Sequence, residues 1–258
     1  MIADLCLVLL LDASGSVDAA EWELQAKATA EALSSPAIVE QVLRGPHGRI
    51  AVAAMEWSGA ALEILPWTTI ASAGDAARVA AALQAYQRRQ SGSTAVGDAL
   101  VAAGSMFHQG VAGRPVACGR QVVDISSDGA SNAGQSPAGA VAFLQAMDVQ
   151  VNAIVIQPAD ADPSANSGLP PGSTGGEIGV LEFYEKTVSG FVLEASWEGY
   201  AEAIRRKLAL EIAGYPELRK RSFPVDHSLP LARSTCGPWL TPGCARQAEI
   251  AYEPWLLG

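Results

Sequence analysis

Hydrophobic residues lie along the chain in short continuous runs, and these runs alternate with longer, alanine-rich stretches. The first run, residues 5–12, is apolar until it ends on Asp12, which is typical of a parallel strand covered on both faces. Similar runs predict strands at residues 50–57, 121–126, 149–156 and 191–194. A further extended segment at 62–70 contains Pro66, and proline is confined to edge strands or bulges. We therefore expect an edge strand at 62–70.

The stretches between these runs have the composition of helices. Residues 18–33 begin with Asp18, an expected N-cap, and carry Glu21 and Glu23 in the first turn, where acidic side chains favour a helix. The same interpretation predicts helices at residues 74–88, 96–107, 137–147, 178–186 and 197–213. Strands separated by helices predict an α/β fold with a doubly wound, mostly parallel sheet, one antiparallel edge strand and helices on both faces.

Two segments depart from this alternation. Residues 157–176 form a long, polar, turn-rich stretch, which we expect to be a surface loop that helps to select a binding partner; an insertion without a role is the alternative. From residue 214 onward the chain is proline-rich and lacks clear periodicity. We therefore expect one domain at residues 1–213 and a C-terminal extension at 214–258.

Composition narrows the class of protein. The 258 residues are 49% hydrophobic and 17% charged, which suits a folded domain with a substantial core. The formal net charge of −10 disfavours binding to nucleic-acid phosphates. No apolar run approaches the roughly 18 residues of a membrane span, and the start of the chain lacks the basic segment of a signal peptide. We expect either an intracellular protein or a mature exported form.

The cysteines bear on the compartment. Cys236 and Cys244 lie close together in the proline-rich segment, where a disulfide would pin a loop, and Cys6 and Cys118 lie near the starts of two strands that are expected to be neighbours. Two such disulfides favour an oxidising compartment, so we expect a periplasmic or extracellular protein. The alternative is a cytoplasmic protein in which all four cysteines are small apolar residues.

Oxygen-bearing side chains gather where the predicted strands end. Asp12 ends the first strand and Ser14 and Ser16 follow it, Thr94 precedes a predicted helix, and Asp128 follows a later strand. Parallel strands point their carboxyl ends to one edge of the sheet, where open α/β folds bind ligands. We therefore expect these five side chains to converge at this edge of the sheet, which we call the rim. Taken singly, each has an ordinary alternative as a turn residue or a helix cap.

The three pieces, DASGS, the threonine of GSTAVGDAL and the aspartate of SSDG, resemble the metal-ion-dependent adhesion site (MIDAS) of von Willebrand factor A-type domains. The resemblance covers about residues 4–213 and extends to bacterial, often exported members of unassigned function. It implies a Rossmann-like fold in which Ser14, Ser16 and Thr94 bind a divalent cation directly, while Asp12 and Asp128 act mainly through water.

This set of donors suits a hard cation. Mg²⁺ prefers oxygen ligands and retains several waters, so we expect Mg²⁺, or else Mn²⁺ or Ca²⁺, and no other cofactor. Because few carboxylates would bind it directly, the cation keeps an open position for an Asp or Glu of a partner protein. We expect a metal-dependent protein-binding module for adhesion, scaffolding or assembly, and not an enzyme. The alternative is a Mg²⁺-dependent hydrolase or phosphoryl-transfer enzyme that uses the same rim.

Other polar residues have ordinary interpretations. The histidines are scattered without the spacing of metal ligands. Asp124 lies inside a predicted strand, so we expect it to be buried and hydrogen-bonded, and Asp98 is expected to be an exposed acid in the first turn of a helix. Glu56 and Trp57 end a predicted strand, and lining the rim is the functional alternative for them.

Overall fold

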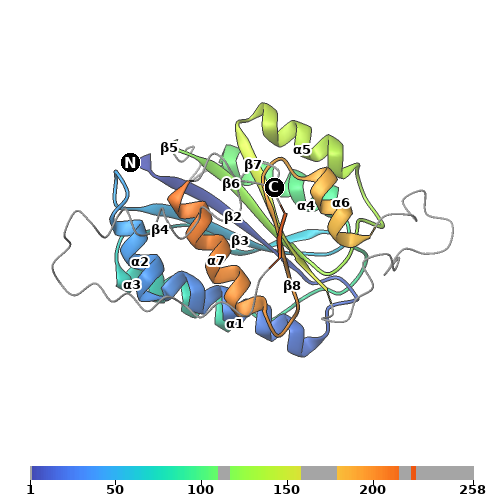
Figure 1. Ribbon diagram of the computed structural model, residues 1–258, viewed down its shortest axis with the longest axis horizontal. Helices are drawn as coiled ribbons and strands as arrows, with labels where there is room; N and C mark the ends of the chain where they lie inside the picture. Colours follow the sequence, from blue (N-terminus) through green and yellow to red (C-terminus); the bar gives the residue numbers. More distant parts are fainter. Residues whose placement is uncertain (1, 110–116, 158–178, 215–221, 225–258) are drawn as a thin grey trace, which may run out of the picture. The chain divides into compact units, whose positions relative to one another are not determined.

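A sheet of seven strands lies at the centre of the described residues, in the order β4-β3-β2-β6-β7-β8-β9 (Figure 1). The computed structural model describes residues 2–109, 117–157, 179–214 and 222–224. The strands are β1 (Ile2–Ala3), β2 (Leu5–Asp12), β3 (Ile50–Trp57), β4 (Ala61–Ile70), β5 (Ala117–Cys118), β6 (Gln121–Ser127), β7 (Val149–Ile156), β8 (Val192–Ala195) and β9 (Ser222–Pro224). Neighbouring strands of the central sheet are parallel except β3 and β4, which pair antiparallel at its edge. Strands β1 and β5 pair separately, in parallel.

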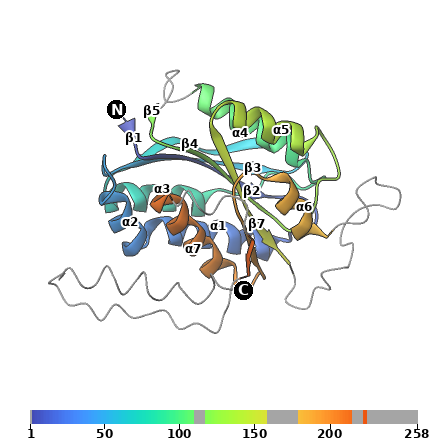
Figure 2. The same cartoon turned by 45° about the horizontal axis from the view of Figure 1, so that its top comes forward.

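Helices cover both faces of this sheet (Figures 1 and 2). They are α1 (Ala19–Ser34), α2 (Pro36–Leu43), α3 (Ala73–Ala85), α4 (Val96–Gln109), α5 (Pro137–Ala146), α6 (Val180–Thr187) and α7 (Tyr200–Ala213). In Figure 2, α1, α2, α3 and α7 lie below the sheet, while α4 and α5 lie above it. Helix α6 packs into the same core as α4 and α5. This arrangement confirms the predicted α/β class with its mostly parallel sheet and antiparallel edge. Among the described helices, none combines the length and the apolar character that crossing a membrane requires.

Strand β2 shows why the first apolar run is continuous. Leu7 and Leu9 belong to the core beneath α1, α3 and α7, whereas Val8 and Leu10 belong to the core against α4 and α5. Alternate residues of a strand point to opposite faces of its sheet, so a strand covered on both faces needs an apolar residue at every position. The structure confirms this interpretation, and β2, β3 and β7 begin and end at the predicted residues.

Helix α3 ends at Ala85, three residues before the predicted end. The physical reason is a tertiary contact of Glu56, which is completely buried. The backbone N–H groups of Arg89 and Gln90 donate to the Glu56 carboxylate at 3.0 and 2.7 Å. These contacts draw the chain after α3 toward the end of β3, and a continued helix would not allow them.

Two further elements differ from the predicted pattern at their boundaries. Ser35 ends α1, and its hydroxyl accepts from the N–H of Ile38 at 3.4 Å, so α2 begins immediately where no helix was predicted. Helix α7 begins at Tyr200, not at residue 197, because the preceding residues form a turn in which the Gly199 N–H donates to the Ser196 carbonyl at 3.1 Å. Both boundaries depend on local turn geometry that hydrophobic periodicity does not report.

The chain divides into two units, Met1–Val225 and Asp226–Gly258. The second unit, with the predicted Cys236–Cys244 pair, lies outside the described residues, as does nearly all of the predicted loop at 157–176. Within the first unit, β9 adds a parallel strand beside β8, from the segment that was expected to be a C-terminal extension.

Cys6 and Cys118 form a disulfide, with their Cα atoms 5.7 Å apart and a sequence separation of 112 positions. The bond joins β2 to the short strand β5, which directly precedes β6, the neighbour of β2 in the sheet. This confirms the pairing predicted from the two strand starts. Closing so long a loop restricts the unfolded chain and so stabilises the folded domain.

Candidate metal site

The loop that follows β2 presents two serine hydroxyls beside a buried carboxylate. Asp12, the last residue of β2, is completely buried, and its Oδ1 accepts from the backbone N–H of Ser14 at 2.7 Å. The Oγ atoms of Ser14 and Ser16 lie 3.1 Å apart. Ser14 is buried, whereas Ser16 is exposed, so the chain of oxygens runs from the core to the surface.

The loop after β6 completes this chain of oxygens. The Ser16 hydroxyl donates to Oδ1 of Asp128 at 2.6 Å. Beside it, the Ser127 hydroxyl donates to Oδ2 of Asp12 at 2.6 Å. Because β2 and β6 are adjacent parallel strands, their carboxyl ends bring residues more than a hundred positions apart into direct contact. Ser127 contacts the rim directly, and the motif pattern did not single it out.

Thr94 reaches the same rim from the segment before α4. Its backbone N–H donates to Oδ1 of Asn132 at 2.8 Å, and the Asn132 N–H donates back to the Thr94 carbonyl at 3.0 Å. A Cβ atom placed on Gly129 would lie 3.6 Å from the Thr94 hydroxyl oxygen. Thr94 therefore lies against the Asp128–Gly129 turn. The structure thus brings all five predicted residues to one rim, and their role as metal ligands stays a prediction.

The electrostatics of the rim favour a bound cation. Burial and, second to it, the negative charge of Asp128 raise the pKa of Asp12 to about 7, although the hydrogen bonds from Ser127 and Ser14 act to lower it. Burial also raises the pKa of Asp128, while the hydrogen bond from Ser16 and the charge of Arg88 oppose that rise. Two desolvated carboxyl groups that repel one another are stabilised by a positive ion between or beside them. The set of two carboxylates and three hydroxyls consists of hard oxygen donors, which fits Mg²⁺ or Mn²⁺.

Hydroxyl groups are essential to this set. Among the described residues, no group of three or more His, Cys, Asp or Glu side chains is placed to hold a metal ion. The rim contributes two carboxylates, so any ion there depends on Ser14, Ser16 and Thr94 for the remaining protein donors. A site of this kind binds a hard cation more weakly than a cage of carboxylates and leaves room for water or an outside ligand.

Two side chains that the motif pattern missed hold the backbone of the rim. Gln25 of α1 clamps Asp12: its Oε1 accepts from the Asp12 N–H at 3.1 Å, and its Nε2 donates to the Asp12 carbonyl at 2.9 Å. Arg88 donates to carbonyl oxygens of the loop that follows β2. Neither residue stands at a fixed spacing from the motif, so the sequence carries no local signal for these contacts.

Glu56 and Trp57 do not line the rim surface, and this corrects the alternative considered for them. Both side chains are completely buried. The Glu56 carboxylate accepts from the Tyr86 hydroxyl at 2.6 Å in addition to its two backbone contacts. Trp57 belongs to the core on the side of α4. Glu56 therefore acts on the rim indirectly, because it holds the segment that carries Arg88.

Asp124 is buried, as expected, and forms an ion pair with the completely buried Lys207 of α7. Asp98 differs from the expectation of an exposed acid: it is half-buried, and its Oδ1 accepts from Nε2 of Gln135 at 2.9 Å. Both carboxylates therefore have structural partners within the described residues and are not part of the rim.

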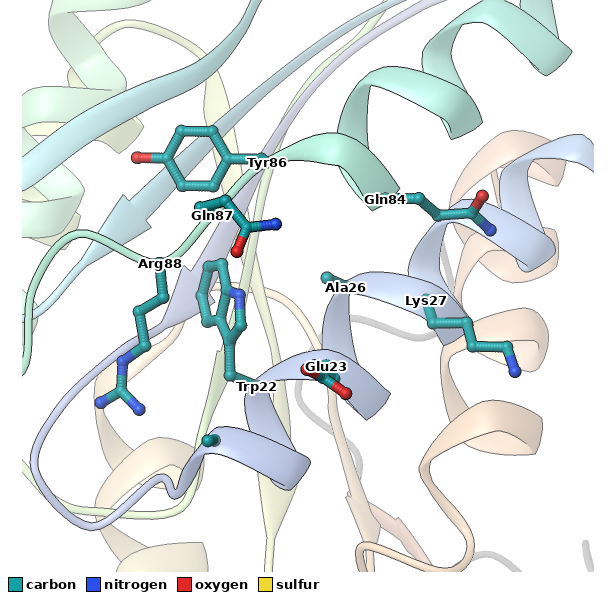
Figure 3. Close-up of a pocket in the computed structure, with 9 residues that line it drawn as sticks. Trp22, Glu23, Ala26, Lys27, Gln84, Tyr86, Gln87 and Arg88 are labelled. Atoms are coloured by element: carbon teal, nitrogen blue, oxygen red, sulfur yellow. The ribbon is translucent and has the colours of Figure 1, made fainter.

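A groove of about 500 Å³ lies beside the rim, between α1 and the segment that follows α3 (Figure 3). Trp22 and Tyr86 lie next to each other in its lining, with ring centroids 6.3 Å apart and ring planes inclined by 53°. Figure 3 shows the Arg88 side chain extending from this groove toward the loop after β2. Arg88 is thus shared by the groove and the rim.

The sheet order, the helices on both faces and the oxygen-lined rim define a von Willebrand factor A-type fold. The chain belongs to the family described as "Protein of unknown function (DUF1194)", whose model matches residues 2–216. No curated protein sequence matches it.

Solved structures of several proteins share this fold. Proximal thread matrix protein 1 from the mussel byssus, described with a zinc-occupied MIDAS motif, has a TM-score of 0.60 and 20% identity, over 82% of this chain and 48% of its own. The conserved hypothetical protein BatB from Bacteroides thetaiotaomicron has a TM-score of 0.53 and 15% identity, over 81% of this chain and 97% of its own. A von Willebrand factor type A protein from Catenulispora acidiphila has a TM-score of 0.50 and 16% identity, over 81% and 43%. The chain spans about half the length of the mussel protein, and identities this low show the fold alone.

Proposed function

We propose that the rim binds a divalent cation, Mg²⁺ or Mn²⁺, and that the protein uses this cation to bind a partner protein. The observation that carries the proposal is a continuous series of polar contacts. The Ser14 N–H donates to Asp12 at 2.7 Å, the hydroxyl oxygens of Ser14 and Ser16 lie 3.1 Å apart, and the Ser16 hydroxyl donates to Asp128 at 2.6 Å. The hydroxyls of Ser14, Ser16 and Thr94 are the direct ligands in this proposal. Asp12 and Asp128 supply negative charge around them.

The chemistry of the donors suggests how a partner would bind. Neutral hydroxyls transfer less charge to a cation than carboxylates do, so the bound ion keeps its attraction for a further anionic oxygen. A carboxylate from an Asp or Glu of another protein satisfies this attraction. A role in adhesion or assembly follows, and the von Willebrand A-type fold of the mussel byssus protein is consistent with it.

We propose a binding role and not an enzymatic one. The cationic side chain in contact with the loop is Arg88, and its guanidinium donates to backbone carbonyls. An arginine does not lose its proton in proteins, so it does not serve as a general base at the rim. We propose that the protein captures its ligand without transforming it.

We further propose that the protein works outside the cytoplasm. The disulfide between Cys6 and Cys118 supports this location, since disulfides persist in oxidising compartments and are rare in the cytosol.

Metal binding is tested by calorimetric titration with MnCl₂ and by thermal unfolding with and without chelator. We expect Mn²⁺ to raise the melting temperature of the wild-type protein, because an ion that binds only the folded state adds about 2.7 kcal/mol when present at 100 times its Kd. Ser14→Ala and Asp128→Ala should abolish the response. Ser105→Ala is the matched control, because Ser105 is an exposed serine of α4 whose hydroxyl donates only to the Val101 carbonyl at 3.2 Å. A wild-type response that both rim variants retain would overturn the assignment.

A further inference from the structure

Arg88 makes an unusual set of contacts for a half-buried surface arginine. Its Nη2 donates to the carbonyl oxygens of Ala13 and Ser14, at 2.8 Å each, and its Nη1 donates to the carbonyl of Val17 at 2.7 Å. Its Nε donates to the carbonyl of Gln90 at 2.8 Å. Three of these four carbonyls belong to the loop that carries Ser14 and Ser16. The guanidinium therefore binds the backbone of the loop whose side chains form the rim.

The planar shape of the guanidinium makes this arrangement possible. It presents its N–H donors in a rigid fork, so one side chain fixes several carbonyls at once. A lysine ammonium is a compact point charge on a flexible stem and does not reproduce the fork. The contacts span 71 to 75 residues of sequence, so they fix the loop relative to a distant part of the chain.

The backbone next to Arg88 is itself held in place. The backbone N–H groups of the next two residues, Arg89 and Gln90, donate to the buried carboxylate of Glu56. This anchors the Arg88 backbone to the end of β3. Arg88 thus connects the loop after β2 to β3, on one side of β2. Asp128 follows β6, on the other side of β2.

The positive charge of Arg88 disfavours a cation at the rim, in contrast to its contacts with the loop. The Nη2 atom of Arg88 lies 2.8 Å from the Ser14 carbonyl oxygen, so its positive charge is close enough to the rim to repel a metal ion. The loop contacts favour metal binding because they order the hydroxyls in advance, whereas the charge disfavours it. Substitutions separate the two effects, because lysine keeps the charge without the fork and methionine removes both.

We propose that Arg88 is a positioning residue for the metal rim: its fork holds the loop so that the hydroxyls of Ser14 and Ser16 face Asp128 before the cation arrives. The inference rests on the proposed function, that the rim binds a divalent cation. Organisation of the loop outweighs the repulsion, since an ordered loop spares the ion the entropy cost of fixing it on binding.

The test measures Mn²⁺ affinity by calorimetry for the wild type, Arg88→Lys and Arg88→Met, at a temperature well below the melting point of each protein. We expect both variants to bind Mn²⁺ at least about tenfold more weakly, equivalent to ~1.4 kcal/mol. In the metal-free variants, amide hydrogen exchange at residues 13–17 should be faster than in the wild type. Arg89→Lys and Arg89→Met are matched controls, because the Arg89 side chain is exposed and lies over the Tyr86 ring at 5.3 Å.

Each outcome decides between explanations. Tighter binding in Arg88→Met with wild-type binding in Arg88→Lys would show that only charge matters and overturn the inference. A lower melting temperature with unchanged Mn²⁺ affinity and unchanged exchange at residues 13–17 would reduce Arg88 to a stabilising residue and also overturn it. If the wild-type protein itself takes up no Mn²⁺, the proposed function fails, and the inference fails with it.

Discussion

Replacing Lys207 by methionine tests the buried charges beneath α7. Lys207 is completely buried, and its Nζ donates to Oε1 of Glu211 at 2.7 Å and forms an ion pair with Asp124. The side chain of Asn152 also donates to Oε1 of Glu211, at 2.8 Å. Two carboxyl groups therefore share one ammonium in the core. Lys207→Met keeps about the volume of the side chain and removes the ammonium that contacts both carboxyl groups, while Arg120, which donates to the Glu211 backbone carbonyl at 2.7 Å, stays in place.

The expected loss is large. Removing one partner of a buried ion pair leaves an uncompensated charge and costs about 3–5 kcal/mol of the free energy of unfolding. Each kcal/mol lowers the melting temperature of a domain of this size by about 2–4 °C, so the melting temperature should fall by roughly 6–20 °C. Lys186→Met is the matched control, because the Lys186 side chain is 62% exposed in its pair with Glu182. Its loss should stay within about 0.5 kcal/mol.

The loss should also depend on pH. Burial and, second to it, the charge of Glu211 raise the pKa of Asp124 to about 7, while Lys207 opposes both effects. A carboxyl whose pKa is raised by folding contributes stability that is fully present below about pH 4 and is lost as the pH rises through the folded pKa. Without Lys207 the pKa of Asp124 rises further, so the variant continues to lose stability above pH 7, where the wild type has levelled off.

Urea unfolding at pH 5 and pH 8, in the presence of chelator, measures the effect. The difference in free energy of unfolding between the wild type and Lys207→Met should be larger at pH 8 than at pH 5. Equal differences at the two pH values would show that the carboxyl groups are not desolvated as described. A loss no greater than that of Lys186→Met would refute the reasoning altogether.

Two further predictions concern the disulfide and the rim. Replacing Cys6 and Cys118 together by serine should lower the free energy of unfolding by about 2–5 kcal/mol, and reductant should lower that of the wild type similarly; free thiols at both positions in unreduced, digested protein would contradict the pairing. At the rim, the stability contributed by the raised pKa of Asp12, about 7, is lost as the pH rises through that value. Asp128→Asn removes one cause of that raised pKa, so the metal-free variant should lose less stability than the wild type between pH 5 and pH 8. Thermal unfolding in chelator measures this difference, and equal losses would show that Asp128 does not act on Asp12.

Local features of the sequence were sufficient to predict most of the fold. The continuous apolar run of β2 has one simple structural explanation, a strand covered on both faces, and the structure shows that burial. The start of α1 is equally local: Asp18 accepts from the Glu21 N–H at 2.8 Å, and the Glu21 carboxylate accepts from the Asp18 N–H at 2.7 Å. Contacts of this kind involve residues three positions apart, so a short stretch of sequence specifies them.

The candidate site was predictable for a different reason. Asp12, Thr94 and Asp128 each follow or precede a strand or helix whose type was evident, and parallel strands place their carboxyl ends on one edge. The motif therefore indicated which residues would meet, although it did not indicate their hydrogen bonds. Ser127, which donates to Asp12, stands directly before Asp128 in SSDG, but it was not among the predicted site residues.

Only the tertiary structure decided how the rim is held. The sequence pattern predicts a helix that includes Arg88. In the structure the helix ends earlier, because Glu56 binds the backbone N–H groups of Arg89 and Gln90. The contacts of Arg88 with the rim loop, and the placement of Lys207 between Asp124 and Glu211, join elements whose side chains have no fixed spacing in sequence. Hydrophobic periodicity reports which face of an element is buried. It does not report which polar groups meet once the faces are covered, because that depends on how the helices and strands pack in three dimensions.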